Sequence, residues 1–211
     1  PTLSADPKLG ANVGGLIAYL KKLDAESTPS MSGLSVSYSD TDSMTGALFS
    51  QLYWKADTRR LSLLAAGAEI NNEYDDFLGT GQTVETQDNV HTFGFRYLHR
   101  LRPGGWFVGI QGISTNYAVG ADGILEGALN QIGLSGFDAT GLGLVFQLDT
   151  MNNQRDPSDG HLHTFHNFAY SESLGGETSF DVAYADLRWY RSIERFSVGK
   201  SGRSPVIAIQ L

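Results

Sequence analysis

The stretch GLGLVFQLDTMNNQRDPSDGHLHTFHNFAYSESLGG, residues Gly141–Gly176, decides the fold that this chain is expected to adopt. Its first nine residues alternate between large apolar side chains and small or polar ones, a period of two that is typical of a β-strand with two unlike faces. A turn rich in Asn, Asp, Pro and Gly follows, and a second strand is expected from about His161 to Tyr170. The stretch therefore predicts an antiparallel hairpin. The apolar face of its first strand consists of Leu142, Leu144, Phe146 and Leu148.

The same alternation recurs along the chain. Segments such as Ser32–Ser39, Thr92–Leu98 and Trp106–Gln111 place apolar side chains on one parity and Gly, Ser, Thr or Gln on the other. The late segment Phe180–Trp189 alternates as well, but its phase slips, which we interpret as a β-bulge near Ala185. About ten strands joined as hairpins are expected, without a long helix.

Composition limits the class of protein. Hydrophobic residues make up 41% of the 211 residues and charged residues 18%, below the roughly 25% typical of soluble domains. The absence of cysteine excludes disulfides and thiolate metal sites. A net charge of −8 without a basic run argues against nucleic-acid binding. No stretch is long and apolar enough for a transmembrane helix. We expect residues 1–211 to form a single domain.

Two all-β architectures fit these strands. A soluble β-sandwich buries apolar faces between two sheets, whereas a transmembrane β-barrel turns them to lipid and encloses a polar interior. Here the face opposite the apolar one is small and polar, short and long loops alternate, and Trp54, Trp106 and Trp189 lie near strand ends, as aromatic residues at membrane interfaces do. We therefore predict an all-β fold, an antiparallel transmembrane β-barrel of about ten strands. A soluble β-sandwich or lipocalin-like binding protein is the alternative.

Segment Gly141–Gly160 resembles the signature of the bacterial surface antigen superfamily, the BamA/TamA-like outer-membrane barrels that include the barrels of patatin-like phospholipase fusions. The family pattern is an alternating strand, then Asp-Thr-Arg-Asp-Asn, a few residues, Pro, two residues and Gly. The turn motif Asp149, Asn153, Pro157 and Gly160 matches it. Weaker matches occur in the family's order at Gly14-Gly15, Leu52-Tyr53-Trp54, Phe77-Leu78-Gly79-Thr80-Gly81 and Asp181–Tyr190.

The resemblance implies a protein of the outer membrane of a Gram-negative bacterium, in contact with lipid, that serves as membrane anchor, conduit or assembly and translocation barrel. A fused or associated periplasmic or passenger domain is a further implied partner. The chain departs from the family at Met151, where relatives have arginine, and lacks their Arg-Gly-Phe/Tyr loop motif. Relatives close with sixteen strands, so this chain is either a short barrel or the N-terminal portion of a longer one.

Three charged residues are expected to form a polar network in the barrel lumen. Arg96, Asp149 and Arg188 fall on the small, polar side, and a charge inside a barrel needs a partner. We expect Asp149 to pair with Arg188 across the hairpin. The role of this network is structural, and we predict no cofactor, no resident metal and no catalytic residue.

Three histidines form the candidate chemical site. His161 and His163 share a strand face and suit metal chelation, although histidines at a strand end beside water have the same pattern. His166 with Ser171 or Ser173 suits an interfacial hydrolase, the first alternative function, but no nucleophile-elbow motif is present. We therefore favour a structural role for all three histidines.

Overall fold

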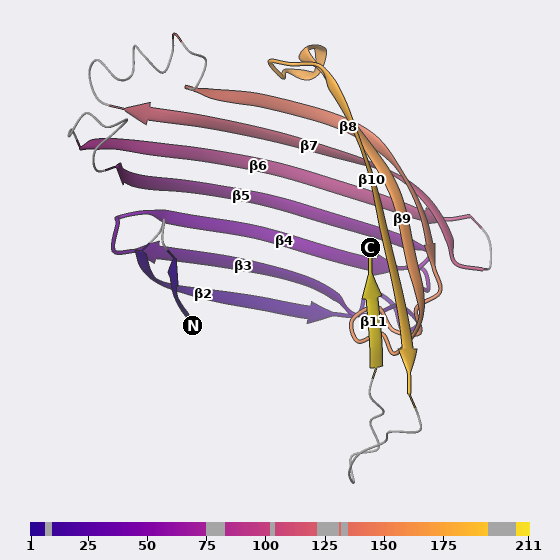
Figure 1. Ribbon diagram of the computed structural model, residues 1–211. Coiled ribbons are helices and arrows are strands. Elements are labelled where there is room, and N and C mark those ends of the chain that lie inside the picture. Colours follow the sequence, from indigo (N-terminus) through magenta and orange to yellow (C-terminus); the bar gives the residue numbers. More distant parts are fainter. Residues whose placement is uncertain (7–9, 75–82, 102–103, 122–130, 132–134, 194–205) are drawn as a thin grey trace.

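The computed structural model describes residues 1–6, 10–74, 83–101, 104–121, 131, 135–193 and 206–211. It is one antiparallel sheet of eleven strands in which each strand pairs with the next along the chain (Figure 1). Among the described residues helix is confined to short pieces, such as the 3-10 turn η2 (Glu172–Leu174). The strands are β1 (Thr2–Asp6), β2 (Gly10–Lys21), β3 (Ser30–Ser39), β4 (Met44–Trp54), β5 (Arg59–Tyr74), β6 (Val84–Arg100), β7 (Trp106–Ala121), β8 (Gly136–Asp149), β9 (Asp159–Tyr170), β10 (Phe180–Ser192) and β11 (Val206–Gln210).

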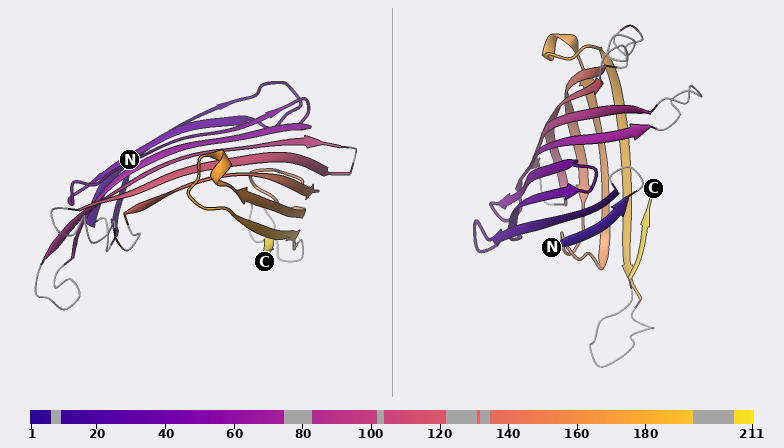
Figure 2. Two further views of the ribbon diagram at one scale, coloured as in Figure 1. Left: turned by 90° about the horizontal axis from the view of Figure 1, so that it is seen from above. Right: turned by 90° about the vertical axis from the view of Figure 1, so that its left-hand side faces the viewer.

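The sheet is curled but not closed. Strands β9 to β11 pass in front of β4 to β7 in Figure 1, and the two views of Figure 2 show the resulting trough. Strands β1 and β11 are its two edges and do not pair with each other. The all-β antiparallel fold is therefore confirmed, with eleven strands rather than about ten, as a single open sheet.

The strand register divides the side chains between two faces. Leu144 pairs with Ile110, whereas its neighbour Val145 pairs with Gly109 and His166, so alternate residues leave opposite sides. Arg60 of β5 contacts Asp149 of β8 although two strands separate them, so their side of the sheet is concave. We call this side the concave face and the side of Leu144 the outer face.

The buried apolar core is small and lies on the concave face. Leu98, Phe107 and Val145 are at most 5% exposed and belong to neighbouring strands. The outer face, by contrast, keeps large apolar side chains accessible, and the single sheet places no second layer of strands against it. Its exposed members include Ile17, Leu34, Leu48, Phe93, Ile110, Leu142, Leu144, Phe146, Phe165 and Ile209.

Two details differ from the sequence predictions. The β9–β10 register runs without interruption from Phe180–Tyr170 to Arg191–Asp159, so the predicted bulge near Ala185 is wrong. The phase slip instead places Phe180 and Tyr184 on the concave face. The polar segment Asn71–Gln87 is expected from the sequence to be a long loop, but β5 and β6 extend into it from both sides. The motif at residues 77–81 lies outside the described residues.

We predict that Gly109→Ala destabilises the sheet. A methyl group there would overlap the carbonyl oxygen of Tyr97 and lie 2.8 Å from Leu98 Cδ2, inside the small core. Overpacking of this kind costs about 1–3 kcal/mol, which the urea midpoint of unfolding would report. Gly15→Ala is the matched control because its added Cβ meets no atom within 4 Å. Equal midpoints for the two variants would contradict the prediction.

Candidate functional site

An ion pair spans the concave face between strands that are not neighbours. Arg60, near the start of β5, lies with Nη1 2.5 Å from Oδ2 of Asp149, the last residue of β8. The two side chains are 9% and 1% exposed. Asp149 also accepts hydrogen bonds from Gln154 Nε2 and the Met151 amide, and the Arg60 guanidinium lies 4.0 Å from the centre of the Phe107 ring. The pair is therefore desolvated, and Asp149 has further hydrogen-bond partners, whereas the buried Nε of Arg60 has none among the described residues.

A second polar chain lies deeper along the same face. Arg96 donates from Nε to Gln111 Oε1 at 2.9 Å, and Gln111 donates from Nε2 to the Asn167 carbonyl oxygen at 2.8 Å. The same amide lies 2.9 Å from His166 Nδ1, and the His166 ring stacks on Tyr184. Gln111 is 1% exposed, so this chain of contacts fixes the Arg96 guanidinium between β6, β7 and β9.

The turn between β8 and β9 contains Asn153, Pro157 and Gly160. Asn153 Oδ1 accepts the amides of Arg155 and Asp156, which shapes the turn before Pro157. Gly160 has φ +103°, and a Cβ there would overlap the Thr150 carbonyl oxygen, so glycine is required at this position. The Arg155 guanidinium donates to the Pro29 carbonyl oxygen, which ties this turn to the loop between β2 and β3.

The three residues of the predicted lumenal network all lie on the concave face, but their partners differ from those expected. Asp149 pairs with Arg60 rather than with Arg188. Arg188 forms a two-point contact with Asp186, at 2.5 and 3.0 Å, two residues earlier on the same face of β10. Local spacing favours the Arg188–Asp186 pair, and curvature of the sheet brings Arg60 to Asp149.

A cavity of about 360 Å³ opens at this end of the concave face. Its lining contains four arginines from four separate elements, together with tyrosine, glutamine and serine side chains. The arginines are Arg60 of β5, Arg96 of β6, Arg155 of the β8–β9 turn and Arg188 of β10.

The three histidines do not converge. His161 and His163 lie on the outer face with ring centres 4.7 Å apart, and His163 packs against Trp189. His166 points to the concave face, while Ser171 hydrogen-bonds the Ser173 hydroxyl. No group of three metal-ligating side chains occurs among the described residues. His161 and His163 therefore belong to the cluster of aromatic rings at this end of the outer face.

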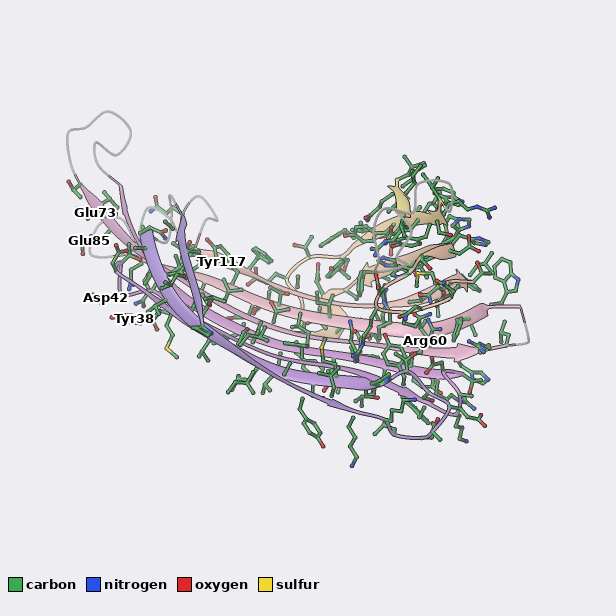
Figure 3. All side chains as sticks on the ribbon, turned by 90° about the horizontal axis from the view of Figure 1, so that it is seen from below. Tyr38, Asp42, Arg60, Glu73, Glu85 and Tyr117 are labelled. Atoms are coloured by element: carbon green, nitrogen blue, oxygen red, sulfur yellow. The ribbon has the colours of Figure 1, made fainter. Side chains whose placement is uncertain are left out.

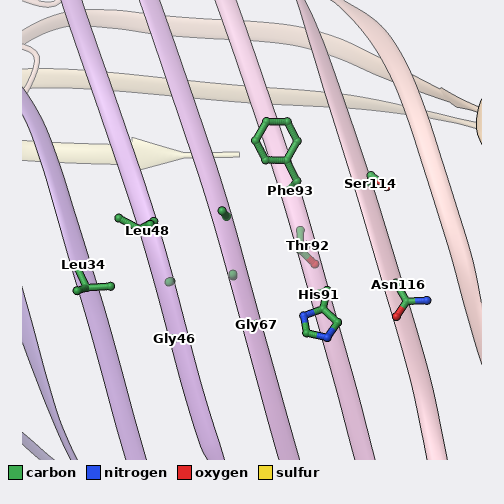
Figure 4. A pocket seen from close by; sticks show the side chains of 12 residues that line it. Leu34, Gly46, Leu48, Gly67, His91, Thr92, Phe93, Ser114 and Asn116 are labelled. Carbon is green, nitrogen blue, oxygen red and sulfur yellow. The ribbon is translucent and has the colours of Figure 1, made fainter.

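Aromatic side chains line one end of the outer face. Trp54, Trp106 and Trp189 all lie on this face near strand ends, at the same end of the sheet. Further along the strands the outer face becomes hollow and then polar: Figure 4 shows Gly46 and Gly67 between Leu48, Phe93 and His91, beside Asn116. On β5 to β7 the apolar band is therefore bounded on both sides, whereas on β1 to β4 exposed apolar side chains continue to this end, among them Leu3, Val13, Tyr38 and Met44.

Charge is distributed unequally along the strands. Glu73, Glu85 and Asp42 lie at the end opposite Arg60 (Figure 3). In the described part of the chain that end carries acidic side chains and no Lys or Arg, whereas arginines and lysines gather near the tryptophan end.

Sequence reasoning missed Arg60 and Gln111. Both had a usable signal, because Arg60 shares the parity of Ser62 and Gln111 alternates with Ile110, which places them on the polar face.

Among the described residues no helix is long and apolar enough to cross a membrane. No protein-family model and no curated protein matches the chain.

Asp24 connects the β2–β3 loop to the β4–β5 turn. Its carboxylate accepts the Ser27 hydroxyl at 2.9 Å and the amides of Ser27 and Lys55 at 2.8 and 2.7 Å. These hydrogen bonds, that of the Ser27 hydroxyl foremost, hold the pKa of Asp24 below its ordinary value because they favour the ionised form.

We predict a pH-dependent contribution from this connection. Since the folded-state pKa of Asp24 is lowered, its stabilising effect is present above about pH 4, the unfolded pKa, and is lost as pH falls through the folded pKa. Ser27→Ala should raise the pKa of Asp24 in a carboxyl ¹³C NMR titration, whereas Ser173→Ala should not. An unchanged pKa in Ser27→Ala would refute the assignment.

We also predict that Asp149→Asn lowers the free energy of unfolding by about 3–5 kcal/mol, because it leaves the Arg60 charge buried without its partner. Denaturant unfolding measures the loss. Arg191→Gln is the control: its contact with Asp159 is 3.5 Å long with side chains 82% and 55% exposed, so the change should stay within about 1 kcal/mol. Losses of similar size in the two variants would count against the buried pair.

Proposed function

We propose that the chain forms the wall of a transmembrane β-barrel of the surface antigen type, in the outer membrane of a Gram-negative bacterium. It would serve there as a membrane anchor, conduit or assembly and translocation barrel, with membrane lipid as its partner. The observation that carries the proposal is the outer face: a broad band of exposed apolar side chains lies opposite a concave face that buries charged groups. In a bilayer the apolar face would contact lipid and the concave face would contact the water of the lumen.

The limits of the apolar band support this proposal. Aromatic side chains at one margin match the residues that prefer the boundary between hydrocarbon and headgroups. At the other margin, on β5 to β7, Glu69, Asn89 and Asn116 continue the outer-face register with polar groups. Exposure of such a band to water would be unfavourable and would favour association, since large apolar patches on soluble proteins mark interaction surfaces.

A membrane location also requires the sheet edges to be paired, because unpaired backbone groups are costly in hydrocarbon. The eleven strands alternate in direction, so β1 and β11 run the same way. Antiparallel closure therefore takes an odd number of further strands between these edges. This parity favours the chain's participation in a larger barrel.

The proposal is tested by two neighbouring substitutions on β3. Leu34 is on the outer face, 45% exposed, and Ser35 is on the concave face. Leu34→Arg should destabilise the lipid-inserted protein by about 2–4 kcal/mol, the cost of an arginine near the middle of a bilayer, whereas Ser35→Arg should have little effect. Folding into lipid vesicles, followed by gel mobility with and without heating, measures the difference.

Tryptophan depth supplies a second readout of the same experiment. Vesicles with lipids brominated near the headgroup should quench the three tryptophans more than lipids brominated at the chain ends. A water-soluble chain gives the opposite result: Leu34→Arg is neutral, and brominated lipids at either depth leave the fluorescence unchanged.

A further inference from the structure

We propose that the arginine-lined cavity on the concave face binds a phosphate group. This inference goes beyond the membrane role, because it depends on the cavity alone. The cavity volume of about 360 Å³ would hold a phosphate with a small attached organic group. The four arginines reach it from elements far apart in sequence, so the fold gathers positive charge at one place.

The charges lining the cavity do not cancel. Asp149 neutralises Arg60, and Asp186 neutralises Arg188. Among the described residues no carboxylate lies within ion-pair distance of Arg96 or Arg155. Two positive charges therefore remain in a chain whose net charge is −8. A dianionic phosphate monoester matches this excess.

The two uncompensated guanidinium groups are held so that donors remain for a ligand. Arg96 uses its Nε–H for Gln111, which leaves the four N–H groups of its terminal nitrogens without a hydrogen-bond partner among the described residues. Arg155 is anchored through Nη2 to the Pro29 carbonyl oxygen. Planar guanidinium groups bind phosphate oxygens in pairs of hydrogen bonds, which gives the site geometric selectivity as well as charge.

Neutral groups complete the site. Tyr53, Tyr190 and Ser62 line the cavity with hydroxyl groups, and Leu98 and Leu162 supply apolar surface. Water is thus partly excluded around the half-buried Arg96, which strengthens its interaction with an anion, whereas Arg155 is exposed at the rim of the cavity. The acidic side chains at the opposite end of the sheet repel anions, so a phosphate approaches from the arginine-rich end.

The test measures binding of inorganic phosphate and glycerol 3-phosphate to the folded full chain by calorimetry at low ionic strength. Saturable binding is expected, and Arg96→Gln and Arg155→Gln should each weaken it about tenfold, the loss of one charged hydrogen-bonding group. Arg191→Gln, exposed and on the outer face, is the matched control and should bind as the unchanged protein does. Circular dichroism confirms that each variant is folded.

A short-chain phosphatidic acid in the detergent micelle distinguishes the source of the phosphate. Tighter binding than glycerol 3-phosphate identifies a lipid headgroup, and equal binding a soluble ligand; either supports the site if Arg96→Gln and Arg155→Gln weaken it. Absence of saturable binding by the folded protein would overturn the proposal. An equal loss in Arg191→Gln would also overturn it, because general surface charge would then explain the binding.

Discussion

The structure depends on one constraint: a single curled sheet must satisfy two unlike faces without a second layer. A β-strand sends successive side chains to opposite sides, so each strand carries both environments at once. The concave face buries a few apolar residues and the Arg60–Asp149 pair, whereas the outer face leaves nearly all of its large apolar side chains accessible. Curvature makes this arrangement work, since it brings concave side chains of distant strands within contact and spreads the outer ones apart.

The Arg60–Asp149 pair illustrates how curvature and polar contacts support each other. Two strands lie between its partners, so the pair forms only in a sheet bent to this extent. Burial makes its loss costly, and its hydrogen bonds to the β8–β9 turn fix the segment that covers this end of the trough. Arg155 extends the same turn to Pro29, across to the N-terminal strands. The polar network thus holds together parts of the sheet that backbone pairing leaves separate.

Features that depend on residues close in sequence could be predicted, whereas features that depend on contacts between distant strands could not. Alternation predicted the strands, the antiparallel hairpins and the face of Asp149, because these depend on neighbouring residues. The partner of Asp149 depends on curvature, which no local pattern encodes, so Arg188 was expected where Arg60 lies. The bulge near Ala185 was inferred from apolar parity alone, and it failed because β10 places aromatic side chains on the concave face. Gln111 was overlooked for a similar reason: its burial comes from packing between three strands.

The separation of charge along the strands joins the outer face to the cavity. The tryptophan margin and the arginines lie at the same end, so the chemistry of the two faces is aligned along one axis. Acidic groups at the far end and unpaired arginines at the near end would favour anions at the cavity over anions at the opposite opening. A sheet that used its polar face merely to avoid unsatisfied groups would need paired charges throughout. The two unpaired arginines exceed that need, and this excess is the reason to treat the concave face as a binding surface as well as a structural one.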